Sequence, residues 1–493
     1  NHSPPTDCRH RNFSGTLPLG LMPDWTSELR PFHYRFTILK NDDFGEALGN
    51  TRMIAENIMA RERVLYKGHA MAAVAATDTN IAEEAVGLIQ VDYEVLTPIL
   101  SVHDALKEDA PLLHENLTTT FRVERFGKGD DTGVKSNIAG HIQFKRGDLE
   151  RGFKEADIIV EREYNTKSVH QGYIEPHAST GHWSPDGHLT IWTSTQGSFN
   201  IRDSTAAVLG ISESMVKVVP MEIGGGFGGK TVIYLDPVVA ILSKKTGTPV
   251  KITMTRKEVF EGTGPTSGTH MRCKIGADKS GRITAAELYL AFEAGAFPGS
   301  PVGGGAMSGL GPYKIDNLLV DGYDVVVNKP KTAAYRAPGA PNAAFAAEQV
   351  IDELAQKLSL DPIAFRLNNA AKIGTRRVDG PTFPLIGCVE VLEAMRDHPH
   401  YNSPLEGPNR GRGVALGFWF NVGLQSTCNI AVNADGTVSL VEGSPDIGGT
   451  RASISMQAAE VLGIRAEDVR PTVADTDSVG YTSVTGGSRV AFA

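Results

Sequence analysis

A glycine run that ends in lysine and threonine is the first stretch of this sequence whose residues could do chemistry. Residues 222–231 read EIGGGFGGKT, and from Gly224 the spacing is G-x-x-x-x-G-K-T. This is the Walker A pattern, in which main-chain N–H groups and the lysine hold the phosphates of a nucleotide. A P-loop also needs an apolar strand before the glycines and a helix that begins at the Lys-Thr pair.

The neighbouring sequence does not meet those two conditions. Pro220 interrupts VKVVPMEI, which is otherwise strand-like, and proline is disfavoured in a central strand. The first helix signal is the Asp-Pro pair at 236–237, six residues beyond Lys230. A P-loop NTPase that uses Gly224–Thr231 is therefore kept only as an alternative. The preferred interpretation is that so many glycines let main-chain N–H groups approach an anion or an oxo group.

Further segments of the chain are short, rich in small residues and carry a few polar groups. They are QGYIEPHAS (171–179), STQGSFNIRD around Gln196, AAYRAPGAPNAAFAAEQ around Arg336, GSPDIGGT around Asp446 and DTDSVGYTSVTGGSR (475–489). With the glycine run, their order and spacing resemble the molybdenum-binding large subunit of the xanthine dehydrogenase / aldehyde oxidase family of molybdenum hydroxylases. ARERVLYKGHAMAAVAAT resembles the start of that family's small hammerhead domain. The resemblance covers about residues 55–493, and we expect a chain truncated at both ends.

This resemblance implies a cofactor, a reaction and partners. The cofactor is molybdopterin with molybdenum, expected in its cytosine dinucleotide form. The reaction hydroxylates a carbon of an aldehyde or an N-heteroaromatic substrate, with water as the oxygen source. Electrons then pass to [2Fe–2S] clusters and FAD, expected on an iron–sulfur subunit and a FAD subunit or in missing regions. A cytoplasmic location is expected.

The resemblance also assigns residues, by motif. In this family no side chain ligates molybdenum directly. Gln196 and Arg336 are the expected catalytic residues, Gln196 through a hydrogen bond to a molybdenum ligand and Arg336 through its fork-shaped guanidinium. The expected cofactor-binding set is Gln196, Gly225, Gly226, Phe227, Gly228, Arg336, Gly486, Gly487 and Ser488. Within it, Gln196, Phe227, Arg336 and Gly487 are expected in the second sphere of the metal.

The sequence departs from the family pattern at several positions. Thr231 stands where purine-oxidising members have glutamate, and the purine-binding arginine expected in GGGAMSGLGPYK is absent, so xanthine is a poor substrate candidate. Gly449 stands where the family has a glutamine that reaches the cofactor. The family's general base, a glutamate in a G-x-G-E segment, does not occur in this chain. The chain alone is expected to be inactive.

Three explanations of that missing base stay open. The chain is a fragment, or one half of a split molybdenum subunit whose other half is a partner, or a degenerate copy. A cofactor-free scaffold with the same fold is the second functional alternative.

Two acidic motifs look catalytic or metal-binding but have simpler interpretations. Glu175 and His177 in YIEPH are expected to form a satisfied buried pair, because buried polar groups are nearly always hydrogen-bonded. Asp475 and Asp477 are expected to stabilise a turn or a helix end rather than hold a metal.

Periodicity and turn signals indicate the elements that must position these residues. We expect an α+β protein: a small hammerhead-like α/β domain, then two related mixed α+β molybdopterin-binding domains, the second incomplete. The expected boundaries are 1–50 irregular, 51–100 hammerhead-like, 101–150 connector, 151–400 first molybdopterin-binding domain and 401–493 the N-terminal part of the second.

Composition narrows the functional classes. The 493 residues are 41% hydrophobic and 21% charged, a globular balance, and the net charge of −9 argues against a nucleic-acid partner. No run of about 18 apolar residues occurs, so no membrane-spanning helix is expected. The cysteines, Cys8, Cys273, Cys388 and Cys428, show no C-x-x-C spacing, which assigns iron–sulfur clusters to other chains.

Overall fold

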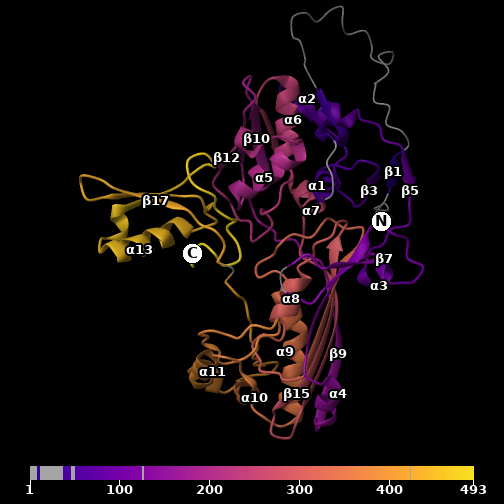
Figure 1. Ribbon diagram of the computed structural model, residues 1–493, viewed down its shortest axis with the longest axis vertical. Helices are drawn as coiled ribbons and strands as arrows, with labels where there is room; N and C mark the ends of the chain where they lie inside the picture. Colours follow the sequence, from indigo (N-terminus) through magenta and orange to yellow (C-terminus); the bar gives the residue numbers. More distant parts are fainter. Residues whose placement is uncertain (1–7, 11–36, 46–49, 125–126, 422, 493) are drawn as a thin grey trace, which may run out of the picture.

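The computed structural model describes residues 8–10, 37–45, 50–124, 127–421 and 423–492. The molecule is elongated (Figure 1): a mixed α/β part at one end, a long sheet with helices at the other, and a C-terminal hairpin with its helix projecting sideways. The mixture of helices and strands agrees with the α+β class expected from the sequence.

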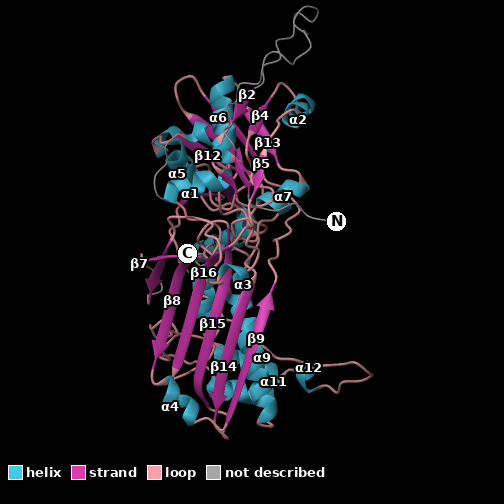
Figure 2. Cartoon of the chain, turned by 90° about the vertical axis from the view of Figure 1, so that its right-hand side faces the viewer, coloured by secondary structure: helices cyan, strands magenta, loops and turns pink. Residues whose placement is uncertain are grey.

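The largest element is a seven-stranded sheet, whose strands run along the long axis of the molecule (Figure 2). In spatial order its strands are β7 (Asp130–Lys135), β6 (Thr118–Arg122), β8 (Ile138–Arg146), β16 (Leu318–Val326), β15 (Ile283–Gly295), β14 (Thr269–Ala277) and β9 (Ile158–Thr166). Helices α8 (Val302–Ser308) and α9 (Ala340–Lys357) pack against it. The core between them includes Met271, Leu288 and Val350, all 0% exposed. Because α9 carries small and aliphatic residues on one stripe, it lies close against the strands.

The segment expected as a connector belongs largely to this sheet. Strands β6, β7 and β8 lie within residues 118–146, and β8 pairs with β16, more than 170 positions later (Asp321 opposite Gln143). Only the stretch before Thr118, with the short helix α3 (Val102–Ala105), serves as a connection. The turn cluster GKGDDTG concealed the strands because it falls at the β6–β7 hairpin, where turn residues are expected.

A second sheet carries the glycine run. Its order is β12 (Val216–Pro220), β11 (Leu189–Thr193), β10 (Ala178–Trp183) and β13 (Val250–Thr253). Helix α5 (Ser198–Leu209) follows β11, and α6 (Asp236–Thr246) follows the glycine run. Gln196 lies between β11 and α5, so the strand end and the helix start fix its position.

The N-terminal unit packs on this second sheet. It contains helices α1 (Asn50–Ile58) and α2 (Thr79–Gly87) and two small sheets. The first sheet has the strand order β3 (Arg63–Val64), β1 (Cys8–His10) and β5 (Tyr93–Val95), and the second pairs β2 (Thr37–Leu39) with β4 (Ala73–Ala75). Leu39 and Met59 share one buried cluster with Leu189 and Val218. The two units therefore have a common core.

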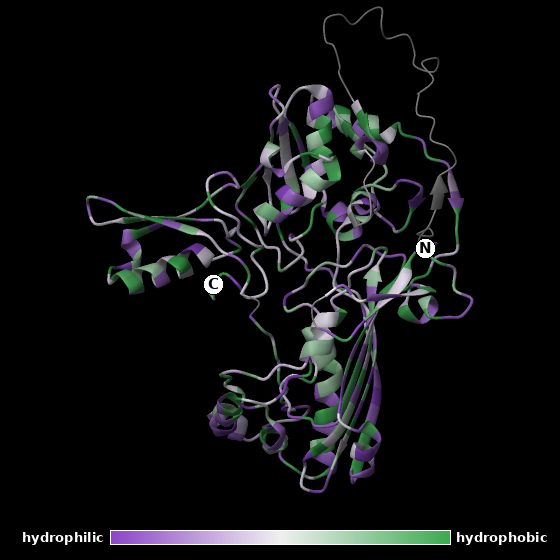
Figure 3. Ribbon diagram, viewed as in Figure 1, coloured by the Kyte–Doolittle hydropathy of each residue, from purple (hydrophilic) through white to green (hydrophobic). Residues whose placement is uncertain are grey.

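The C-terminal unit repeats the topology of the second sheet. Strands β17 (Cys428–Val432) and β18 (Val438–Glu442) are antiparallel, helix α13 (Thr450–Leu462) follows, and β19 (Val469–Val473) pairs parallel to β18. Strands β10 and β11, helix α5 and strand β12 have the same order and directions. Figure 3 shows hydrophobic residues on the projecting hairpin and on α13.

The remaining elements are short helices and turns that connect the units already described. They are α4 (Leu149–Lys154), α7 (Arg256–Gly262), α10 (Pro362–Asn369), α11 (Cys388–Asp397), α12 (Pro399–Asn402) and the short 3-10 turns η1 (Asn41–Phe44), η2 (Glu213–Met215) and η3 (Ala466–Asp468).

A fully buried arginine ties α9 to α10. The Arg366 side chain is 0% exposed, its Nε donates to Glu348 Oε2 at 3.0 Å, and the N–H of Leu416 donates to the same oxygen at 2.7 Å. Removing one member of a buried ion pair leaves an uncompensated charge.

We predict that Arg366→Ala destabilises the fold by about 3–5 kcal/mol. The control variant Arg162→Ala removes the ion pair between the exposed Arg162 of β9 and Glu353 of α9. It should lower the free energy of unfolding by less than about 1 kcal/mol. Urea unfolding followed by circular dichroism measures both variants. Equal losses would contradict this account of Arg366.

Candidate active site

The buried amide of Gln196 joins two segments that are far apart in the sequence. Its Oε1 accepts hydrogen bonds from the N–H groups of Gly228 (2.9 Å) and Lys230 (3.3 Å), and its Nε2 donates to the carbonyl of Thr485 at 2.9 Å. Its main chain pairs with the same two segments: the N–H donates to Lys230 O and the carbonyl accepts from the N–H of Thr485. Gln196 therefore acts as a clamp, and one N–H of its amide is left over for another acceptor.

The glycine run is packed too tightly for side chains. A Cβ at Gly226 would lie 2.5 Å from Gln196 Oε1, and one at Gly228 would lie 2.5 Å from the carbonyl of Ala334. Gly228 also has φ of +105°, which L side chains rarely adopt. The glycines thus allow the loop to lie directly against Gln196 and the Arg336 segment.

Backbone strain collects at the same place. Five described residues other than glycine have positive φ, and three of them are Phe227 (53°), Ala337 (59°) and Ser488 (57°). These three lie in the glycine run, the Arg336 segment and the Ser488 turn, which the sequence had pointed out separately. The N–H of Arg336 donates to the carbonyl of Phe227 at 2.9 Å, so the first two segments are directly joined. Such residues cost roughly 1–3 kcal/mol each and cluster at functional sites.

The three segments present main-chain donors to this region. Within the described part of the chain, the N–H groups of Gly225, Gly226, Phe227, Gly487 and Ser488 have no main-chain acceptor. We call Gly225–Gly228, Arg336 and Gly486–Ser488, together with Gln196, the cradle. Unpaired N–H groups on adjacent residues form a concave site for negatively charged or oxo groups.

Arg336 is the exposed cation of the cradle. Its residue is exposed, and among the described residues its guanidinium has no hydrogen bond or ion pair. It is consequently available to a ligand, whereas the neighbouring cation Lys230 is not.

Lys230 is a structural residue, which excludes a P-loop. Its side chain is 0% exposed, and its Nζ donates to Glu175 Oε2 and to Ser194 Oγ, both at 2.7 Å. Helix α6 begins only at Asp236, so no helix N-terminus faces the glycines. A Walker lysine must reach phosphate oxygens, and this one is already paired inside the protein. The NTPase alternative is wrong.

Glu175 and His177 are both satisfied, but not by each other. Glu175 pairs with Lys230 and accepts the N–H of Gly224 at 2.7 Å, and its side chain is 30% exposed. His177 is buried and its Nε2 lies 2.7 Å from the hydroxyl of Tyr173. The expected buried pair is therefore two separate contacts that support the underside of the glycine run.

The acidic residues near the C-terminus organise turns. Asp475 Oδ1 accepts the N–H groups of Asp477 (2.9 Å) and Ser478 (3.0 Å), as expected of a turn. Asp446 accepts the N–H groups of Gly448 and Thr450 at the start of α13. Burial raises the pKa of Asp446, but hydrogen bonds from Arg451, Gly448 and Thr450 outweigh it and lower the pKa well below its usual value.

Sequence reasoning missed two arginines that support the cradle. Arg489 is 1% exposed, and it donates to Ser444 Oγ (2.8 Å) and to the carbonyls of Ser483 (2.9 Å) and Val484 (3.1 Å), which fixes the turn that holds Ser488. Arg451 joins Asp446 to Glu222, both at 2.8 Å, and so connects α13 to the start of the glycine run. No spacing signal distinguishes either arginine.

Gly449, at the family's glutamine position, leaves open space beside α13. Its φ is +93°, and no atom lies within 4 Å of the place that a Cβ would take. A glutamine there would therefore have room, but its backbone would be strained.

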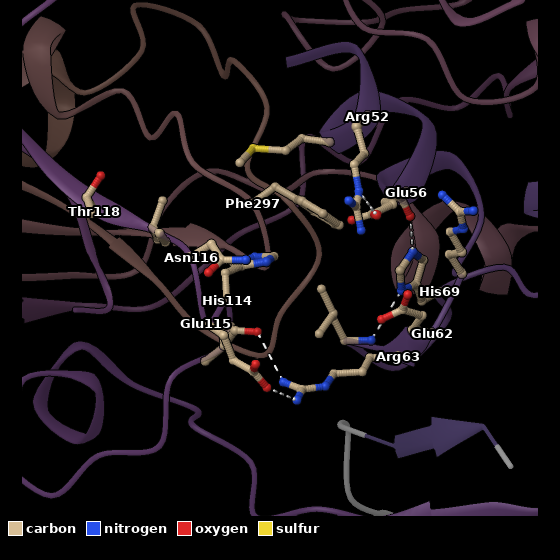
Figure 4. Close-up of a pocket in the computed structure, with 15 residues that line it drawn as sticks. Arg52, Glu56, Glu62, Arg63, His69, His114, Glu115, Asn116, Thr118 and Phe297 are labelled. Atoms are coloured by element: carbon tan, nitrogen blue, oxygen red, sulfur yellow. Dashed lines mark hydrogen bonds and ion pairs between the residues drawn. The ribbon is translucent and has the colours of Figure 1, made fainter. Parts of the chain in front are cut away.

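A cavity of about 520 Å³ lies apart from the cradle, between α1 and residues 113–118 (Figure 4). Its arginines are paired: Arg52 Nε lies 2.7 Å from Glu56, Arg63 Nη2 lies 2.9 Å from Glu115, and Arg61 Nε lies 3.3 Å from Asp42. With its charges compensated, this cavity has no obvious chemical role. Among the described residues, no group of three or more His, Cys, Asp or Glu side chains could hold a metal ion. The described helices include none that is long and apolar enough to cross a membrane.

Comparisons with known proteins show which domains the chain contains. A family model for a molybdopterin cofactor-binding domain matches residues 131–370, a second such model matches 393–493, and the aldehyde oxidase and xanthine dehydrogenase a/b hammerhead domain matches 36–97. The nicotinate dehydrogenase large molybdopterin subunit of Eubacterium barkeri is 31% identical over 346 residues, which cover 69% of this chain and 77% of that protein.

This chain is a molybdopterin-binding member of the xanthine dehydrogenase / aldehyde oxidase family.

Other members of this molybdenum hydroxylase family resemble the chain over much of its length. A probable xanthine dehydrogenase subunit of Bacillus subtilis is 29% identical over 88% of this chain and 57% of its own. The aldehyde oxidoreductase of Desulfovibrio gigas superposes with a TM-score of 0.80 at 23% identity, over 92% of this chain and 51% of that one. The chain thus spans about half the length of several relatives. The expected hammerhead domain followed by two molybdopterin-binding domains is confirmed.

We predict that Gly226→Ala lowers the molybdenum and pterin content of the purified protein at least about tenfold. This corresponds to a loss of ~1.4 kcal/mol in the free energy of cofactor binding. The added Cβ would displace Gln196 from the glycine run. Gly411→Ala, at a glycine with open space, is the control and should keep full content. Elemental analysis and fluorescence of the oxidised pterin measure the result. Unchanged content in Gly226→Ala would contradict the cradle.

We also predict that His177 makes stability depend on pH. Burial, with smaller contributions from Lys230 and His170, lowers the pKa of His177 to about 3. The ring of the unfolded chain titrates at about pH 6.5. The stability that the neutral, buried ring contributes is therefore fully present above that pH and is lost as the pH falls towards 3. The urea midpoint of His177→Asn should therefore fall less steeply than wild type between about pH 6.5 and 4. The exposed control His400→Asn should keep the wild-type slope.

Proposed function

We propose that this chain holds the cofactor of a molybdenum hydroxylase. The enzyme hydroxylates a carbon of an aldehyde or N-heteroaromatic substrate, with water as the oxygen source. Electrons leave through [2Fe–2S] clusters and FAD, held on partner chains or in regions of the protein outside this sequence. The observation that carries the proposal is the convergence of three strained segments, with five unpaired N–H groups, around the clamp formed by Gln196.

The donor set of the cradle fits a molybdopterin. A Cβ at Gly226 would fill the space beside Gln196, so glycine keeps that space open. The groups available there are N–H donors rather than metal ligands, which suits a metal that is held by its own pterin. When bound, the cofactor supplies a molybdenum centre that accepts two electrons while the substrate gains an oxygen derived from water. We propose its cytosine dinucleotide form, with Gly225–Gly228 and Gly486–Ser488 on two sides of it.

Two side chains of the cradle have proposed roles toward the reacting groups. The N–H of Gln196 that is not used by Thr485 donates to an oxygen ligand of the metal without adding charge. Arg336 orients the substrate, because its unpaired guanidinium can hold a carbonyl or oxygen anion in a fixed direction. Phe227, 47% exposed, is the apolar group beside them.

The substrate is proposed to be other than a purine. Thr231 donates its hydroxyl to the carbonyl of Gly228 at 2.9 Å, so the side chain in the family's glutamate position completes the loop. Relatives named for nicotinate and for aldehydes represent the two substrate classes of the proposal, whereas another relative is named for xanthine, a purine.

A second molybdenum-subunit half, in a longer form of this protein or on a partner chain, is proposed to supply the general base. Every residue of β17 is exposed, including Ile430 (50%) and Val432 (70%), although Ile430 lies opposite Leu440 on the face that α13 covers. Val461 (87%) and Met456 (62%) are exposed apolar residues on α13 itself. Covering these side chains with the other half of the domain would bury apolar surface at roughly 25 cal/mol per Å². The base glutamate would enter with that half.

We predict that Arg336→Ala in the assembled enzyme lowers kcat/KM by about 10–100-fold, the loss of one charge-assisted hydrogen bond of ~1.5–3 kcal/mol. Molybdenum content should not change, because the guanidinium holds no part of the cradle. Arg272→Ala, on the large sheet, is the control with wild-type kinetics. A full loss of molybdenum in Arg336→Ala would show that the arginine is structural.

The function itself is tested by metal and pterin analysis followed by turnover with an artificial electron acceptor. We expect molybdenum and pterin in the chain, no turnover by the chain alone, and turnover once the partner half is added. Absence of molybdenum from the assembled complex would favour the cofactor-free scaffold. Turnover by the chain alone would contradict the need for a partner base.

A further inference from the structure

A second cavity, of about 580 Å³, contains two cations, Arg122 and Lys331, that form no ion pair among the described residues, and one carboxylate, Asp324. It lies between α1, the strands β6 and β8, the start of α5 and residues 297–302. One wall is Val232, two residues after Lys230, and Asn200 in the same lining donates to the carbonyl of Thr231 at 2.7 Å. The cavity is thus a neighbour of the glycine run, within the size range of pockets that hold small organic ligands.

Lys331 is the first unpaired cation. Within the described chain, its Nζ reaches only the carbonyls of Gly299 at 3.3 Å and Thr332 at 3.5 Å, both long for a hydrogen bond. The nearest lining carboxylate, Asp324, already accepts the N–H groups of Gly299 (2.8 Å) and Ser300 (2.7 Å). Burial lowers the pKa of Lys331, which Asp324 only partly offsets. The ammonium group therefore lacks a strong partner in this structure.

Arg122 is the second unpaired cation of this cavity. Its guanidinium has no hydrogen bond or ion pair among the described residues, and its Nη2 would lie 2.9 Å from a Cβ at Gly303. Lys331 Nζ would lie 3.1 Å from a Cβ at Gly299. Both cations therefore approach the same five-residue stretch, residues 299–303, and both line the cavity.

Polar and apolar groups complete the lining. The hydroxyl of Ser300 is buried and has no hydrogen-bond partner among the described residues, which is unusual for a buried polar atom. The rest of the lining combines apolar side chains, among them Met53, Ile54, Ile142, Phe297 and Val302, with the polar residues Asn57, Thr120, His141, Asn200, Ser204 and Asp324. A ligand with an anionic end and an apolar body would satisfy both parts.

The cavity of Figure 4 provides the contrast. It shares Met53 and Phe297 with the second cavity, yet its arginines Arg52 and Arg63 are each paired with a glutamate. An uncompensated positive charge is therefore particular to the second cavity. An unpaired charge in a half-buried position destabilises the fold unless a ligand of opposite charge pairs with it.

We propose that the second cavity binds a small organic monocarboxylate with an apolar or aromatic body. Arg122 and Lys331 hold the carboxylate, the hydroxyl of Ser300 donates to it, and the body lies against Phe297 and Val302. The fork of an arginine beside a lysine point charge suits one planar carboxylate. This site does not require that molybdopterin is bound.

Calorimetric titration of the 493-residue chain with benzoate, and with benzamide as its uncharged counterpart, tests the proposal. We expect benzoate to bind one-to-one and at least about tenfold more tightly than benzamide, because charge-assisted hydrogen bonds are the stronger ones. Lys331→Met should weaken benzoate at least about tenfold and Lys331→Arg should largely retain it. Arg52→Met, in the cavity of Figure 4, is the matched control and should bind like wild type.

Thermal unfolding without ligand separates a binding role from a structural one. Lys331→Met removes an unpaired ammonium group, so its melting temperature should equal or exceed that of wild type. Should Lys331→Met fail to fold, Arg122→Gln provides the same titration test. Equal affinity for benzoate and benzamide, or unchanged benzoate binding in Lys331→Met or Arg122→Gln, would overturn the proposal.

Discussion

The hydrogen bonds of the Gln196 amide are the interactions on which the candidate site depends. One buried side chain accepts from Gly228 and Lys230 and donates to Thr485, so it holds the glycine run against a turn more than 250 positions later. Only glycine at 226 lets the amide come this close. The strain at Phe227 and Ser488 is sustained because both segments are fixed by this clamp and by Arg489.

The repeated topology explains why the segments meet. In both units a hairpin is followed by a helix and a strand that pairs parallel to the second hairpin strand. The loops between strand and helix, at Gln196 and at Asp446, therefore occupy equivalent places in the two repeats. The first repeat shares its core with the N-terminal unit, whereas β17 and α13 keep apolar residues exposed, which is the physical basis for proposing a partner half.

Much of the fold and of the candidate site was predictable from the sequence, because segments in which backbones approach closely are rich in glycine and other small residues. The family, the fold class and the segments around Gln196, Phe227, Arg336 and Gly487 were all named from the sequence. Contacts between distant segments could not be predicted. Nothing in the spacing shows that Lys230 turns inward to Glu175, that Arg489 supports Ser488, or that β6–β8 join a sheet whose other strands lie far along the chain.

Hydrogen–deuterium exchange of the chain with and without bound molybdopterin tests the central claim most directly. If the cradle holds the cofactor, binding should slow exchange at residues 225–227 and 487–488, whose N–H groups have no main-chain acceptor within the described chain, and leave the large sheet unchanged. Full cofactor occupancy without any added protection in these two segments would contradict the account.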